Sequence, residues 1–74
     1  MKELNEKIKE LYQRKGYILN RIEELKTAIE FSKEENMDYL EYEMILAELR
    51  EEIRKLNQKI ETLEKAMMII VGLE

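Results

Sequence analysis

Apolar residues in this 74-residue chain recur at alternating spacings of three and four, in two series that a polar segment separates. Such a heptad pattern forms one apolar stripe along an α-helix, and another helix must cover that stripe. The first series comprises Met1, Leu4, Ile8, Leu11, Lys15, Ile18, Ile22, Leu25 and Ile29, and the second Tyr39, Tyr42, Leu46, Leu49, Ile53, Leu56, Ile60, Leu63, Met67 and Ile70. The pattern predicts an all-α coiled coil.

The segment between the two series contains residues that end and begin helices. Asn readily adopts the left-handed conformation that ends a helix, so Asn36 is the predicted end of the first helix. Asp38 and Glu41 have the spacing of a capping box, with Asp in the place of Ser or Thr. We therefore expect a single hairpin domain, residues 1–74, with helices at about 2–34 and 38–71 and a turn at about 35–38.

Folding the chain at this turn sets residue i opposite residue 71 − i, as for Ile18 and Ile53. Nearly every layer of the seam then has apolar residues on both sides. The exceptions are Lys15 opposite Leu56, and Ser32 opposite Tyr39 beside the turn. Because the mirror point of the two series falls within the polar segment, the pairing favours a hairpin.

The alternative architecture is one continuous helix, about 110 Å long, that dimerises in parallel. The polar segment contains no Gly or Pro that would interrupt such a helix. In a parallel dimer, however, Lys15 faces its own copy across the seam. In the hairpin its stem can lie over Leu56 while its ammonium group reaches water. We interpret Lys15 as a residue that selects the hairpin and its register.

The length and composition of the chain point to assembly. A domain this short seldom buries enough surface to be stable without a disulfide, a metal or a partner. The chain has no Cys and no His, which excludes disulfides, thiolate nucleophiles and the usual zinc sites. Its many Glu and Lys residues are typical of coiled coils and also of thermophilic proteins. Oligomerisation is the remaining source of stability.

Apolar residues outside the seam gather near the turn and near the open end. An antiparallel pair of hairpins lays these two ends side by side, and the dimer becomes a four-helix bundle. This architecture resembles the Rop type of bundle, although no residue motif of that family is present. In the alternatives, these residues pack locally, or the C-terminal segment docks on another protein or begins a longer domain. The predicted interface residues are Tyr12, Tyr17, Leu19, Leu40, Met44, Ile45, Met68, Ile69 and Val71.

Basic residues concentrate in the middle of the expected hairpin, although the net charge of the chain is −4. Segments 11–22 and 49–60 carry net charges of +3 and +2, whereas residues 23–48 carry −7. This basic band is a candidate site for RNA, DNA or another polyanion, through Arg14, Lys15, Arg21, Arg54 and Lys55. The acidic total charge opposes long-range attraction of a polyanion. In the alternative interpretation, the cations form ion pairs between the helices, such as Arg21 with Glu52 and Lys26 with Glu43.

Gly16 stands inside the first predicted helix, next to Lys15 and away from the seam. Gly in a helix interior costs about 1 kcal/mol relative to Ala. Such a residue is useful where another helix approaches closely or where the helix bends. A contact of this kind predicts that Gly16→Leu weakens the dimer or a partner complex.

We expect no catalytic residue, metal or cofactor. The acidic residues around the turn lack the glycine and the spacing of an EF-hand, and a two-helix rod offers no cavity for a catalytic carboxylate. The chain has neither a signal-peptide core nor the roughly 20 apolar residues of a membrane span, so we expect a cytoplasmic protein. The prediction is a non-enzymatic adaptor or regulatory protein that acts through homo-oligomerisation and protein contacts. A nucleic-acid-binding bundle and a purely structural oligomerisation segment are the alternatives.

Overall fold

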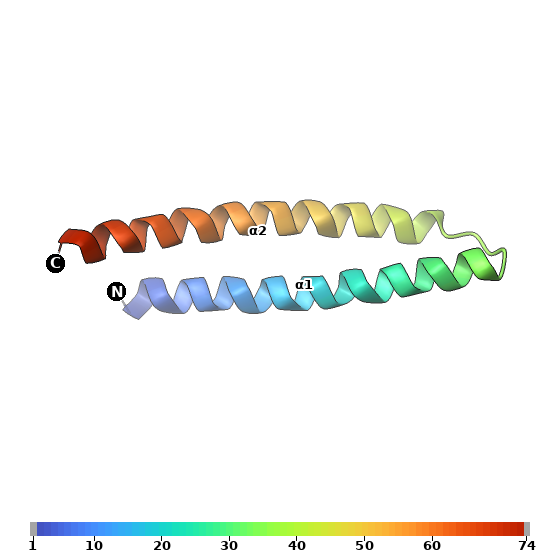
Figure 1. Cartoon of the computed structure of the whole chain (residues 1–74), viewed down its shortest axis with the longest axis horizontal. Helices are drawn as coiled ribbons and strands as arrows, with labels where there is room; N and C mark the ends of the chain where they lie inside the picture. Colours follow the sequence, from blue (N-terminus) through green and yellow to red (C-terminus); the bar gives the residue numbers. More distant parts are fainter. Residues whose placement is uncertain (1, 74) are drawn as a thin grey trace.

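A computed structural model describes residues 2–73 and shows two antiparallel helices joined by one turn (Figure 1). Helix α1 spans Lys2–Glu34 and helix α2 spans Leu40–Leu73. The hairpin is a rod with dimensions of 60 × 15 × 13 Å. The prediction of an all-α chain with two helices is confirmed, whereas the four-helix bundle remains a prediction.

The turn ends α1 at the predicted residue. Asn36 has a φ angle of 56°, which is the left-handed conformation. The Met37 amide donates to the Ser32 carbonyl at 2.8 Å, and the Asn36 amide donates to the Lys33 carbonyl at 3.3 Å. These two bonds form a Schellman motif, which gives partners to carbonyls that the end of a helix leaves open.

Helix α2 begins two residues later than predicted. The Asp38 carboxylate accepts from the Leu40 amide at 3.1 Å, and the Glu43 amide donates to the Tyr39 carbonyl at 3.1 Å. Tyr39 is therefore the N-cap residue, because its carbonyl accepts the first helical bond. The predicted capping box is wrong. Asp38 forms an Asx turn instead, and within residues 2–73 no hydrogen bond joins it to Glu41.

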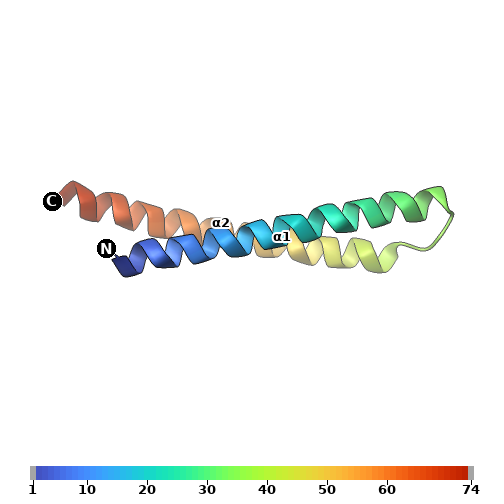
Figure 2. The same cartoon turned by 90° about the horizontal axis from the view of Figure 1, so that it is seen from below.

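The seam is buried along the middle of the rod, where the two helices cross (Figure 2). Coiling of this kind keeps a heptad stripe facing its partner helix. Lys15 is half-buried within the seam, and its ammonium group lies 5.9 Å from the centre of the Tyr12 ring. The buried core consists of Leu11, Ile18, Ile22, Leu25, Ile29, Leu46, Leu56 and Ile60, all of which belong to the predicted series.

The helices are staggered along the rod. At the open end α2 extends past the start of α1, and at the turn α1 extends past the start of α2 (Figure 1). Two seam residues predicted to be buried, Tyr42 and Ile70, are each 39% exposed. The predicted partner of Ile70, Met1, lies outside the described residues. The stagger leaves the open end of the seam partly uncovered, whereas Ile29 and Ser32 near the turn are buried.

Candidate functional site

Two contacts define the two flanks of the seam. On one flank, which we call the Arg14 flank, Arg14 forms an ion pair with Glu52. On the other, the Tyr12 flank, the Tyr12 hydroxyl donates to the Glu64 carboxylate at 3.0 Å. The residue numbers of these pairs add to 66 and 76, whereas those of the core layers were expected to add to 71. Each flank therefore has its own register, displaced from that of the core.

The two interhelical ion pairs predicted from the sequence are wrong. Arg21 bonds Glu24 at 3.2 Å and Lys26 bonds Glu23 at 3.3 Å, both within α1. Glu52 pairs with Arg14 instead, and Glu43 lines a groove together with Lys26 but forms no ion pair with it in the described chain. Residues three apart on one helix are neighbours whatever the position of the other helix, so these pairs form within α1.

Four of the five residues of the predicted polyanion site have a partner within the described chain. Arg14 and Arg21 are paired with acidic residues, and Arg54 is paired with Glu51 in α2. Hydrogen bonding to Arg54 lowers the pKa of the Glu51 carboxyl and raises that of the guanidinium. Lys15 lies beside the Tyr12 ring. Of the five, only Lys55 has neither an ion pair nor an aromatic contact within residues 2–73.

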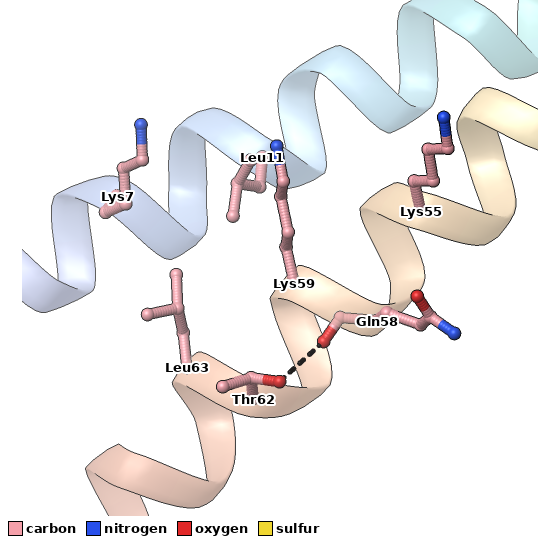
Figure 3. A pocket seen from close by; sticks show the side chains of 7 residues that line it. All are labelled: Lys7, Leu11, Lys55, Gln58, Lys59, Thr62 and Leu63. Carbon is pink, nitrogen blue, oxygen red and sulfur yellow. Dashed lines mark hydrogen bonds between the residues drawn. The ribbon is translucent and has the colours of Figure 1, made fainter.

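Lys55 belongs to a groove on the Arg14 flank, near the open end, which we call the lysine groove. The groove has a volume of about 520 Å³. Figure 3 shows its three lysines with their amino groups extending in one direction, while Leu11 and Leu63 point toward one another from the two helices. No acidic residue among residues 2–73 lines it. Its lining residues are Lys7, Leu11, Lys55, Gln58, Lys59, Thr62 and Leu63.

Across this groove, two like charges stand opposite one another. Lys7 and Lys59 are each one heptad from Arg14 and Glu52, and their numbers also add to 66. Where the middle of the flank has a cation facing an anion, the groove has two facing cations. None of its three lysines forms an ion pair with an acidic residue of the described chain.

A second groove, of about 370 Å³, differs in its charge balance. It is lined by Lys26, Ile29, Glu30, Lys33, Glu43, Leu46, Ala47 and Arg50. Two carboxylates line it beside three cations. Lys26 is also paired with Glu23, and the Lys33 ammonium lies 5.3 Å from the centre of the Tyr39 ring. This mixed-charge groove therefore has carboxylates among the residues that line it, unlike the lysine groove.

The predicted interface residues are exposed, except for Ile45, which packs against the core. The structure places them on both flanks, because Tyr12 and Leu19 share a heptad position on one flank while Tyr17 stands on the other. Tyr12 is already engaged, since its hydrogen bond to Glu64 raises the pKa of its hydroxyl. Tyr17 is 64% exposed and Met68 is 72% exposed. Sequence reasoning missed Lys7 and Lys59 because it summed charge along segments and not along flanks.

The described range was also compared with the requirements of a metal site and of a membrane-spanning helix. Within residues 2–73, no group of three or more acidic side chains is arranged to hold a metal ion. No helix there has the length and apolar character that crossing a membrane requires. Comparison of the chain with protein-family models, curated proteins and solved structures finds no match. The surfaces of the hairpin are therefore the basis for assigning a function.

Proposed function

We propose that this chain is a non-enzymatic interaction protein that self-associates into an antiparallel four-helix dimer and presents helical surface to another protein. The observation that carries the proposal is the exposure of large apolar residues at both ends of the rod. Exposed apolar patches of this kind mark interaction sites in folded proteins. Those residues are Phe31, Met37, Leu40 and Met44 near the turn, and Met68, Ile69, Ile70, Val71 and Leu73 at the open end.

The architecture of the hairpin supports self-association. Each helix has one neighbour only, and the buried core consists of eight side chains. Ordering the backbone opposes folding by about 1–2 kcal/mol per residue, so a chain with so small a core gains much from covering additional apolar surface. A second hairpin provides that cover.

Symmetry favours the antiparallel arrangement. A twofold axis through the middle of the rod lays the turn end of one protomer beside the open end of the other. The turn cluster of each protomer then lies beside the open-end cluster of the other, so the dimer has two equivalent contacts of this kind. A parallel arrangement instead sets each cluster, with its own charges, against an identical copy.

Light scattering during size-exclusion chromatography tests the proposal. At micromolar concentration we expect a mass of 18.0 kDa, twice the 9.0 kDa of the chain. The double variant Ile69→Lys, Leu73→Lys introduces charge into the open-end cluster and is expected to shift the protein to monomer. The control, Gln13→Lys with Asn20→Lys, adds the same charge at exposed positions away from both clusters. A wild-type mass of 9.0 kDa throughout the micromolar range contradicts the proposal.

A second candidate function is binding of RNA or DNA, which the lysine groove favours because its amino groups have no acidic partner in the described chain. The net charge of −4 and the pairing of three arginines with carboxylates weigh against it. Phosphate contacts make such binding fall steeply with salt. Absence of binding to mixed RNA and DNA at low salt excludes this function.

A further inference from the structure

We infer that the lysine groove receives the acidic turn half of a second copy of this chain, so that the dimer forms through the Arg14 flank. This inference rests on the proposed self-association and adds which face of the hairpin forms the contact. Of the apolar residues at the two ends, Phe31, Ile69 and Leu73 belong to this flank. The heptad positions assign Gly16, Met68 and Val71 to the opposite flank, which the inference leaves outside the contact.

The first argument is that the groove lacks an anion. The register that brings Arg14 to Glu52 brings Lys7 to Lys59 one heptad nearer the open end. Facing like charges are unfavourable, and Lys55 adds a third cation to the same groove. The acidic residues of α1 on this flank, Glu3 and Glu10, neither line the groove nor form an ion pair with its lysines. Because no ion pair within the described chain neutralises these lysines, carboxylates of a second molecule can pair with them.

The second argument is that the same flank becomes acidic toward the turn. Residues seven apart share a heptad position, so Glu41 and Glu48 share the position of Lys55 in α2. Neither of these carboxylates forms an ion pair within the described chain. Glu48 also lines a hollow of about 490 Å³ together with Ala47, Glu51, Glu52 and Lys55, and this hollow adjoins the lysine groove through Lys55.

The third argument concerns the apolar groups. The lysine groove has Leu11 and Leu63 between its lysines. At the turn half, Phe31 belongs to the same flank as Glu41 and is 57% exposed. A ligand with carboxylates beside an apolar ring matches both the charge and the apolar base of the groove. A nucleic acid supplies the negative charge but no aliphatic or aromatic side chain.

The middle of the flank agrees with a twofold arrangement. Its arginines are neutralised by Glu52 and Glu24, and Tyr17 is exposed among them. From the open end to the turn, the flank is thus basic, then neutral, then acidic. Reversing a second copy along the rod sets basic against acidic at both ends and brings Tyr17 near its own copy.

A charge exchange between two variants tests the inference. Lys7→Glu with Lys59→Glu makes the groove acidic, and Glu41→Lys with Glu48→Lys makes the turn half basic. Each variant alone sets like charges against each other at both contacts of its homodimer. We expect the dissociation constant of each homodimer to rise at least about tenfold, since facing like charges oppose association. Mixed in equal amounts, the two variants restore complementary charge at both contacts and form a heterodimer of wild-type affinity.

Sedimentation equilibrium measures the association, and circular dichroism establishes that each variant keeps its helices. The first variant retains like charges across its own groove, so its hairpin is expected to be as stable as the wild type. The matched control is Gly16→Leu, which adds an apolar side chain on the opposite flank and leaves dimerisation unchanged.

The outcomes separate the two proposals. If the wild type is a monomer, self-association fails and the inference fails with it. If the wild type dimerises and each charge variant alone dimerises with wild-type affinity, self-association stands and the inferred face is wrong. The same conclusion follows if Gly16→Leu is the variant that disrupts the dimer. If the lysine substitutions abolish binding of a poly(U) probe but not dimerisation, the groove serves a polyanion and the inference is overturned.

Discussion

The two flanks of the seam contain similar residues but arrange their charges differently. On the Tyr12 flank, charges of both signs are interspersed, and the mixed-charge groove has carboxylates beside its cations. On the Arg14 flank, the cations collect at the open end and unpaired carboxylates follow toward the turn. The cations of the mixed-charge groove therefore have carboxylates among the residues that line it, whereas the lysine groove has none among its described lining residues and can receive them from a second molecule.

This difference separates two tasks of one short chain. The seam and the local ion pairs close the hairpin, and exposed ion pairs add little to that, about 0–1 kcal/mol each. The separation of cations near the open end from carboxylates near the turn contributes little to the stability of the hairpin itself. These charges select the direction in which a second rod approaches, because only the reversed orientation matches them.

The comparison is sharpened most by truncating one aromatic or aliphatic side chain on each flank. Tyr17 is 64% exposed and Leu19 is 43% exposed, and the two are neighbours on α1. Tyr17→Ala is expected to weaken the dimer by about 1–2 kcal/mol, the loss typical of a central aromatic contact. Leu19→Ala is expected to leave the dimer unchanged. Isothermal dilution calorimetry measures both dissociation constants.

A larger effect of Leu19→Ala than of Tyr17→Ala reverses the assignment of the two flanks. Equal losses from both variants contradict a dimer that uses one flank only. Chemical denaturation at concentrations below the dissociation constant shows whether either change acts on the hairpin itself.

Gly16 gives a smaller test of the same comparison. A Cβ atom built at Gly16 meets no atom within 4 Å, so the hairpin has room for a side chain there. Gly16→Ala is expected to raise the free energy of unfolding by about 0.5–1 kcal/mol, because Ala has the higher helix propensity. Thermal unfolding followed by circular dichroism measures the change. A loss of stability or of dimerisation means that another helix packs closely on the Tyr12 flank.

The sequence predicted the hairpin well because its two determinants are local. Heptad spacing shows which residues share a face, and Asn36 is suited to end a helix. The start of α2 was missed because Asp38 bonds the amide two residues on, in an Asx turn that competes with the predicted capping box. Tyr42 and Ile70 were predicted to be buried because heptad spacing shows which face a residue is on and not how completely the partner helix covers it.

The candidate site was only partly predictable. Heptad positions identify flanking residues, but the partner of each depends on the displacement between the helices. That displacement pairs Arg14, and not Arg21, with Glu52, and the same shift sets Lys7 opposite Lys59. Summing charge along the sequence therefore gave a basic band with three arginines that are paired in the structure. The lysine groove could not be predicted in this way, because its lysines come from both helices and share one flank.

The most direct test of the antiparallel dimer is a distance between spin labels. The chain has no Cys, so Glu34→Cys, an exposed site at the end of α1, gives a single attachment point per protomer. In an antiparallel dimer the two labels lie at opposite ends, and pulsed electron paramagnetic resonance should give a distance approaching the 60 Å length of the rod. A distance of about 20 Å, roughly two helix diameters, would place both turns together and contradict the account.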